Sequence, residues 1–171
     1  MRIKLYVNDK EHLLNTHGER RLSDVLREDL GLLATKVRCG SGKCGACIVL
    51  AEGELCSSCL VPVGIMQNSH ITTFEHFSQT RDFQDISRVV KSLNMNVPGE
   101  KEPFFYFTLN SIINNIQEIT PENTVSFYKN FENFSFSFET LYQIAKQASA
   151  IRKKRIAEEI AQLNQQRTGK R

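Results

Sequence analysis

The sequence predicts an α+β fold, with a small sheet in its first half and amphipathic helices in its second half. Apolar residues form short runs between turn residues up to about residue 75, and recur at helical spacing after Ser78. All five cysteines lie before residue 60, whereas most of the 11 phenylalanines lie after residue 76. We expect two domains in this chain of 171 residues, over 1–78 and 79–165, and a frayed basic tail over 166–171.

A strand hairpin is predicted at the start of the chain. Residues 2–7 alternate charged and apolar side chains, Asn8-Asp9 is a turn signal, and residues 11–15 can form the returning strand. Apolar residues at helical spacing follow between Leu22 and Leu30. We expect Ser23 or Asp24 to cap this helix and Gly31 to end it.

Three further strands are predicted around the cysteines. They cover residues 48–51, residues 55–61 with Cys59, and residues 71–74. A turn over residues 52–54 joins the first two, so the N-terminal part should be a mixed sheet with one helix.

Four helices are predicted in the second half. The first runs past Ile86 to Leu93, and the second past Phe105 to Ile116. Thr120-Pro121 begins a short third helix, and residues 139–165 form a long fourth one. Four helices of this size indicate a bundle.

A glycine-rich loop contains most of the candidate metal ligands of the sequence. Its cysteines have the spacing C-x4-C-x2-C, at Cys39, Cys44 and Cys47, and Cys59 follows at a distance. This is the plant-type pattern of ligands for a [2Fe-2S] cluster. Glycines between the cysteines allow the sharp turns that bring several thiolates together. The spacing predicts one [2Fe-2S] cluster.

Two other interpretations of the cysteines remain open. A disulfide framework is disfavoured by the odd number of five cysteines and by the absence of a secretory signal at Met1. A zinc site would use two C-x2-C pairs, Cys44 with Cys47 and Cys56 with Cys59, but leaves Cys39 unexplained. If a cluster is bound, Cys56 is a buried thiol without a ligand role.

Over residues 1–78 the sequence resembles the small iron-sulfur subunit of the molybdenum hydroxylases, such as xanthine dehydrogenase, aldehyde oxidoreductase and carbon monoxide dehydrogenase. The resemblance lies in residues 22–31, Thr35-Lys-Val, the cysteine loop, Ser58-Cys-Leu60 and Ile71-Thr-Thr-Phe-Glu75. It implies a β-grasp, ferredoxin-like domain followed by a four-helix domain. It also implies that Cys39, Cys44, Cys47 and Cys59 are the cluster ligands.

The sequence departs from that family in its second half. The family's helical domain holds another [2Fe-2S] cluster through CxxC and CxC motifs, whereas no cysteine follows Cys59 here. Phe104 and Phe107 stand at the CxxC positions, and Ser135 and Ser137 at the CxC positions. Because phenylalanine offers no ligand atom, we expect this domain to be retained without its cluster.

The resemblance implies an electron-transfer subunit with no catalytic residues of its own. Its expected partners are a molybdopterin-binding large subunit and a FAD-binding subunit, with the catalytic site on another chain. The alternative is an interaction or scaffold module, stabilised by zinc or by the cluster, with no redox role.

Charge and hydropathy indicate few other partners. No apolar run is long enough to span a membrane, and we expect a cytoplasmic protein. The basic run from Arg152 to Arg155 is typical of a solvated helix face, so we expect no nucleic acid partner. Lys36, Arg38 and Lys43 flank the cysteine loop, where positive charge would favour the reduced state of a cluster.

Overall fold

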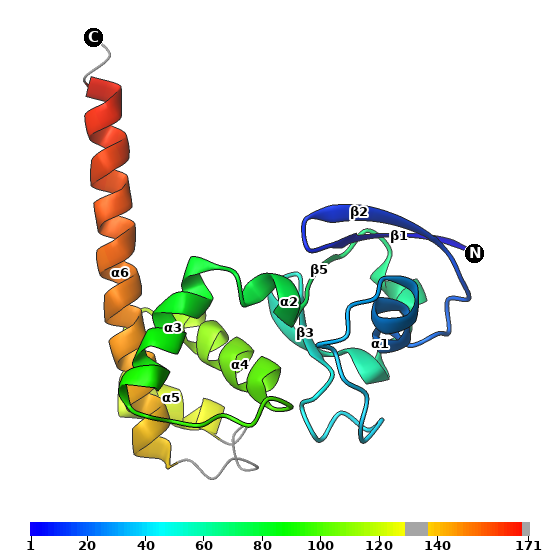
Figure 1. Cartoon of the computed structure of the whole chain (residues 1–171), viewed down its shortest axis with the longest axis horizontal. Coiled ribbons are helices and arrows are strands. Elements are labelled where there is room, and N and C mark those ends of the chain that lie inside the picture. Colours follow the sequence, from blue (N-terminus) through cyan, green and yellow to red (C-terminus); the bar gives the residue numbers. More distant parts are fainter. Residues whose placement is uncertain (129–136, 169–171) are drawn as a thin grey trace.

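The computed structural model describes residues 1–128 and 137–168. It confirms the α+β prediction: strands and short helices come first, and longer helices follow (Figure 1). Residues 129–136 and 169–171 lie outside the described part of the chain, among them Ser135 and the end of the predicted tail.

A five-stranded mixed sheet forms the N-terminal part, in the order β2-β1-β5-β3-β4. Strand β1 pairs with β2 as an antiparallel hairpin and with β5 in parallel, while β3 is antiparallel to both β4 and β5. The strands are β1 (Arg2–Val7), β2 (Lys10–Asn15), β3 (Ile48–Ala51), β4 (Glu54–Ser57) and β5 (His70–Thr72). The predicted turn is confirmed at Asn8 and Asp9, whose φ angles of 53° and 63° suit the twist of a tight hairpin.

A short helical segment covers the sheet and differs from the prediction at its start. Helix α1 (Leu22–Asp24) continues directly into a π-helical turn (Val25–Asp29). Its N-cap residue is Arg21, so the prediction of Ser23 or Asp24 as the cap was wrong. The reason is packing: Leu22 and Ser23 are buried as the first residues of the helix, and Leu22 contacts the sheet core. Gly31 follows the end of this segment with φ +69°, as predicted.

The predicted last strand is shorter than expected. Strand β5 ends at Thr72, and Phe74 begins helix α2 (Phe74–Phe77). Thr73 donates its backbone N–H to the Asn8 side chain at 2.9 Å and ends the pairing of β5. Phe74 thereby points into a second core instead of extending the sheet.

Four longer helices follow, close to the predicted positions. They are α3 (Arg81–Ser92), α4 (Glu102–Asn115), α5 (Pro121–Tyr128) and α6 (Phe138–Thr168). Thr80 caps α3 by accepting the Phe83 N–H at 3.2 Å. Thr120 accepts the Asn123 N–H at 3.4 Å at the start of α5, where Pro121 is the first residue, as predicted.

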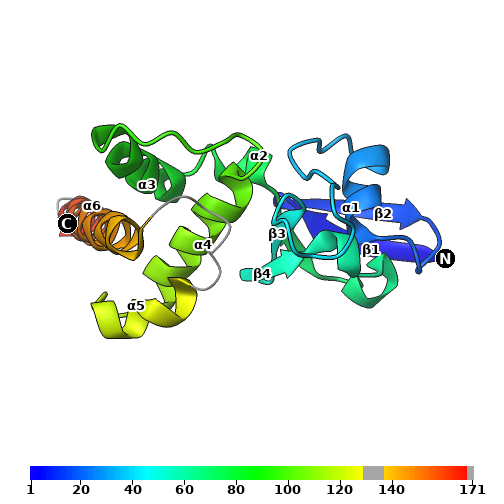
Figure 2. The same cartoon turned by 90° about the horizontal axis from the view of Figure 1, so that it is seen from below.

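The helical part has its own hydrophobic core, which extends onto the sheet. Phe105 and Phe107 of α4 are fully buried in it, and Ile48 and Leu50 of β3 belong to the same cluster. Figure 2 shows α4 crossing between the other helices and the sheet. Helix α4 therefore connects the two parts of the molecule.

The basic run on α6 is only in part the solvated face that the sequence suggested: Lys153 and Lys154 are exposed, but the two arginines pack against other helices. Arg152 is 5% exposed and donates to Asn110 and Asn114 of α4 at 3.0 Å and 2.6 Å. Arg155 pairs with Asp82 and Asp85 of α3 at 2.6 Å and 2.9 Å. These charges tie α6 to α3 and α4, because Arg152 and Arg155 both have partners on other helices.

Helix α6 continues beyond the rest of the fold (Figure 1). It includes residues 166–168, the first three of the predicted tail. Along the described helices, no segment combines the length and apolar character needed to cross a bilayer.

Candidate functional site

The cysteine loop lies between the helical segment α1 and strand β3. It is closed at its base by a hydrogen bond from the Lys36 N–H to the Ala46 carbonyl, at 2.9 Å. Gly40, Gly42 and Gly45 have φ angles of 61°, 74° and 71°, a region that residues with a Cβ atom adopt at a cost. The chain thus reverses direction repeatedly over a few residues.

Cys59 comes next to this loop from the other side of the β3–β4 hairpin. It lies on a 3₁₀ turn (Ser58–Leu60), so the prediction that a strand carries it was wrong. Two hydrogen bonds hold the turn: the Ser58 hydroxyl and N–H both donate to the Cys47 carbonyl, at 2.6 Å and 3.3 Å. The turn replaces strand pairing there and brings Cys59 against Cys47.

The four predicted ligands meet as two neighbouring pairs. Cys39 receives hydrogen bonds from Ser41 and Cys44, and Cys47 interacts with Cys59 and with the charge on Cys44. Exposure differs sharply between them: Cys39 is exposed and Cys44 is intermediate, while Cys47 and Cys59 are 1% and 2% exposed. One side of the group faces solvent and the other faces the protein.

The surroundings of Cys39 and Cys47 shift their pKa values in opposite directions. Hydrogen bonds from Ser41 and then Cys44 lower the pKa of Cys39 to about 6. Burial raises the pKa of Cys47 to about 11, and the neighbouring thiols Cys59 and Cys44 add to that rise. The buried Cys47 thiol therefore favours the neutral form until a cation compensates the charge of its thiolate.

Side chains from three elements press against the loop glycines. A Cβ atom on Gly42 would lie 2.6 Å from Leu60 Cδ1, and one on Gly45 would lie 2.9 Å from the Cβ atom of Phe104. A Cβ atom on Gly40 would lie 3.7 Å from Nη1 of Arg21. The loop thus lies against Arg21, which precedes α1, against the Cys59 turn and against α4.

Cys56 is separate from the ligand group. It lies in β4, is half-buried and packs against the core of the sheet. Burial and the nearby charge of Cys59 raise its pKa. That Cys56 has no ligand role stays a prediction.

Two neighbouring cysteine pairs are the kind of donor set that a two-iron cluster uses. Within residues 1–128 and 137–168, the Cys, His, Asp and Glu side chains form no group of three that could hold one metal ion. A binuclear cluster instead takes two thiolates on each iron, and the site provides two neighbouring pairs. Glycines that leave no room for a Cβ and the Ser41 N–H, which donates to the Cys39 sulfur at 3.4 Å, are further features of such a loop.

Of the positions compared with a second cluster, Phe107, Phe104 and Ser137 lie in the described part of the chain. Phe107 is fully buried, and its ring lies 4.9 Å from that of Phe77 and 6.0 Å from that of Phe74. Phe104 is partly buried against the cysteine loop. Ser137 caps α6, where it accepts the Thr140 N–H at 3.2 Å.

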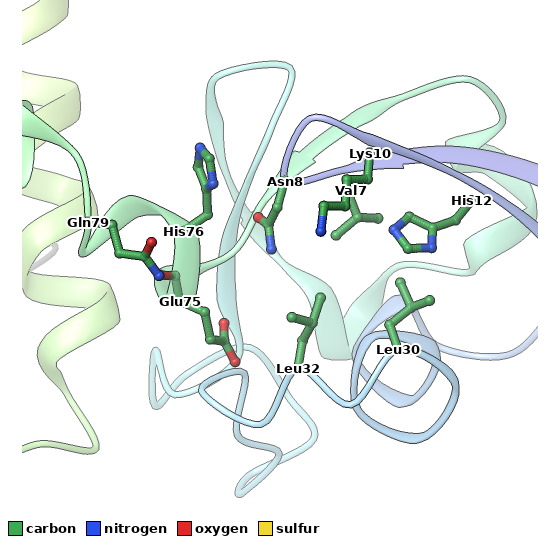
Figure 3. A pocket seen from close by; sticks show the side chains of 9 residues that line it. All are labelled: Val7, Asn8, Lys10, His12, Leu30, Leu32, Glu75, His76 and Gln79. Atoms are coloured by element: carbon green, nitrogen blue, oxygen red, sulfur yellow. The ribbon is translucent and has the colours of Figure 1, made fainter.

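A separate pocket lies beside the hairpin and does not include the cysteines (Figure 3). Its polar lining includes His12, Glu75 and His76. Glu75 accepts the Ala34 N–H at 2.6 Å, and thereby ties α2 to the segment that leads into the cysteine loop. His76 pairs with Asp9 at 3.2 Å. Sequence reasoning missed Glu75, because its partner is a backbone group 41 residues away.

Comparison with known proteins places this site in a family context. The family model described as "2Fe-2S iron-sulfur cluster binding domain" matches residues 5–76. The iron-sulfur-binding subunit PaoA of Escherichia coli (strain K12) aldehyde oxidoreductase is 41% identical over 75 residues, which are 44% of this chain and 33% of that protein. The small FeS subunit of Eubacterium barkeri nicotinate dehydrogenase is 38% identical over 73 residues, 43% of this chain and 46% of that protein. The matches thus span less than half of each relative.

Solved structures extend the likeness to nearly the whole fold. A chain of quinoline 2-oxidoreductase from Pseudomonas putida 86 has a TM-score of 0.76 at 24% identity, covering 91% of this chain and 96% of that one. Aldehyde oxidoreductase from Desulfovibrio desulfuricans ATCC 27774 has a TM-score of 0.74 at 23% identity, covering 89% of this chain and 17% of that one. In sequence over residues 5–76 and in fold over most of its length, this chain resembles the small [2Fe-2S] subunits of the aldehyde oxidoreductase and xanthine dehydrogenase type of molybdenum hydroxylase.

Proposed function

We propose that this chain is an electron-transfer subunit in which Cys39, Cys44, Cys47 and Cys59 hold one [2Fe-2S] cluster. The observation that carries the proposal is the position of Cys59, 2% exposed and in contact with Cys47 at the end of the glycine loop. When bound, such a cluster supplies one-electron redox chemistry.

The protein's own residues prepare the site in two ways. The loop glycines allow the sharp turns of the loop, and the Ser41 N–H already donates to the Cys39 sulfur. Leu60 and Phe104 lie against the loop glycines, and Cys47 and Cys59 are almost completely buried. Hydrogen bonds to sulfur and burial are the two means by which a protein sets the potential of such a centre.

The chain would act in a complex with other subunits. Two relatives are named as iron-sulfur or FeS subunits of oxidoreductases, which favours a catalytic site on another chain. We propose a molybdopterin-binding subunit as the electron source and a FAD-binding subunit or another carrier as the acceptor. Residues 79–165 would form the helical domain that docks these partners, with aromatic side chains in place of a second cluster.

Metal and sulfide analysis of the purified chain tests the proposal. Two irons and two sulfides per chain, with a red-brown colour, are expected for one cluster. A colourless protein with one zinc per chain would overturn it and favour a zinc-stabilised interaction module. Isolation of the native complex, with molybdenum and flavin assays, tests the proposed partners separately.

A further inference from the structure

A short irregular segment, residues 33–36, leads from the first helical turns into the cysteine loop. Arg27 holds this segment from one side, because its guanidinium donates to the carbonyls of Leu33 and Thr35 at 3.3 Å and 2.8 Å. At the end of the segment, the Lys36 N–H makes the hydrogen bond that closes the base of the loop. The position of the segment therefore sets where the loop begins.

Glu75 of α2 holds the same segment from another element. Its Oε1 atom accepts the Ala34 N–H at 2.6 Å, and Figure 3 shows its side chain pointing from α2 toward the part of the chain that holds Leu32. Its Oε2 atom is buried and has no hydrogen-bond donor among the described residues. Because hydrogen bonds to a carboxylate are stronger than those between neutral groups, the contact with Ala34 fixes the segment to α2.

Helix α2 itself is held by the helical core. Phe74 packs against that core and Phe77 is buried in it. The Phe77 ring lies 4.9 Å from that of Phe107 on α4 and 5.9 Å from that of Phe83 on α3. Figures 1 and 2 show α2 between the longer helices and the sheet. The packing of α3 and α4 therefore determines where α2 places the carboxylate of Glu75.

This connection is separate from the other contacts between the helical part and the loop. Phe104 lies against Gly45, and Arg38 pairs with Glu100 at 2.6 Å. Both of these contacts come from α4 or the residues just before it. Glu75 instead acts from α2, on the segment that precedes the cysteines, so its contact can be broken without changing the other two.

We propose that Glu75 is a positioning residue for the cysteine loop, and that through it the packing of the helical part regulates how firmly the loop holds its cluster. This inference rests on the proposed function of the cysteine site. Glu75 acts through Ala34 and not on the cysteines themselves. Since the helical part docks the partners in the proposed function, docking and cluster retention are coupled through α2.

The test compares Glu75→Ala with Glu75→Gln in the full cluster-loaded chain. Both substitutions remove the charge, but glutamine keeps an oxygen that can accept the Ala34 N–H. Glu19→Ala is the control, because Glu19 is exposed in the same part of the chain. Amide hydrogen exchange resolved at Ala34 measures the contact, and the rate of iron loss to a chelator measures how firmly the loop holds the cluster.

Glu75→Ala should raise the exchange rate of the Ala34 amide by at least about tenfold, since a hydrogen bond to a charged group contributes that much to an opening equilibrium. Iron loss should also be faster. Glu75→Gln and Glu19→Ala should stay close to the wild type in both measurements. Unchanged iron loss in Glu75→Ala would overturn the inference, and so would a Glu75→Gln variant that loses iron as fast as Glu75→Ala.

Phe83→Leu tests the link to the helical part, because it loosens the ring packing of α3 against α2. It should speed iron loss in the wild type, and by a smaller factor in the Glu75→Ala background, where the route through Glu75 is already broken. Equal factors in the two backgrounds would show that α2 does not transmit the change, and the inference would be wrong. Absence of iron from the wild-type protein would instead refute the proposed function itself.

Discussion

Phe104 lies directly against Gly45, so that the first turn of α4 closes the inner side of the cysteine loop. A Cβ atom on Gly45 would be 2.9 Å from the Phe104 Cβ and 2.8 Å from its Cγ. Gly45 also has φ +71°. The loop and the helical part therefore depend on each other for their shape, although 59 positions separate the two residues.

Gly45→Ala should weaken cluster retention. The new Cβ meets Phe104, and the left-handed conformation costs about 1–2 kcal/mol for a residue other than glycine. We expect a lower iron content after purification and faster loss of visible absorbance when an iron chelator is added.

The double variant Gly45→Ala/Phe104→Ala separates the two causes. Removing the ring relieves the contact but not the backbone strain, so cluster retention should recover in part. Full recovery would show that backbone strain has no effect, and no recovery would show that the Phe104 contact is not what excludes a side chain at Gly45.

Cys47→Ala should abolish the bound cluster, whereas Cys56→Ala should leave it nearly intact. Cys47 is 1% exposed and lies against Cys59, while Cys56 packs on the sheet core away from the loop. The two changes are chemically identical, so each controls for the other. Visible absorption and iron analysis measure the result, and loss of the spectrum in Cys56→Ala would contradict the ligand assignment.

Local sequence was enough to predict most elements of the fold. The Asn8-Asp9 turn, the Thr120-Pro121 start of α5 and the glycine loop each depend on residues a few positions apart. Their conformations follow from short-range sterics and hydrogen bonds, so they can be predicted from the sequence alone. The spacing of the predicted ligands could be recognised for the same reason, since it depends on one short loop and one hairpin.

Long-range contacts account for the errors. The sequence pattern of residues 55–61 predicts a strand. In the structure, hydrogen bonds from Ser58 to the Cys47 carbonyl turn the end of this predicted strand into a 3₁₀ turn. The sequence predicts that Arg152 is an exposed charge, but in the fold its guanidinium donates to Asn110 and Asn114. Partners 11 to 42 residues away decide both outcomes, and no local pattern contains them.

In the cluster-free protein, Cys39 should be alkylated by iodoacetamide first and Cys47 last. Hydrogen bonding lowers the pKa of Cys39 to about 6, so it is mainly a thiolate at neutral pH, and it is exposed. Burial raises the pKa of Cys47 to about 11, so it stays a thiol. Mass spectrometry of timed samples measures the order.

The pH dependence of this labelling has a definite sign. Alkylation of Cys39 should rise as pH increases through about 6 and then level off, since the thiolate is the reactive form. The Ser41→Pro variant lacks the N–H that donates to Cys39, and its labelling curve should shift to higher pH. An unshifted curve would mean that this hydrogen bond does not stabilise the thiolate.

Arg152→Met should destabilise the packing of α6 on α3 and α4. The substitution keeps most of the side-chain volume but leaves Asn110 and Asn114 without their donor, and weakens the pairing of Asp82 and Asp85. Removing one partner from a buried charge pair costs about 3–5 kcal/mol, and the remaining Arg155 pairs argue for the lower end. Amide hydrogen exchange of α3 and α6 in the full chain measures the loss.

Lys154→Met is the matched control for this network. Its side chain is 80% exposed, and its ion pair with Glu158, at 4.0 Å, lies on the surface of the same helix. The free energy of opening should change by less than about 0.5 kcal/mol. Equal effects of the two substitutions would mean that the buried charges do not hold α6 in place, and that its apolar contacts through Ile144 and Ala148 carry the packing instead.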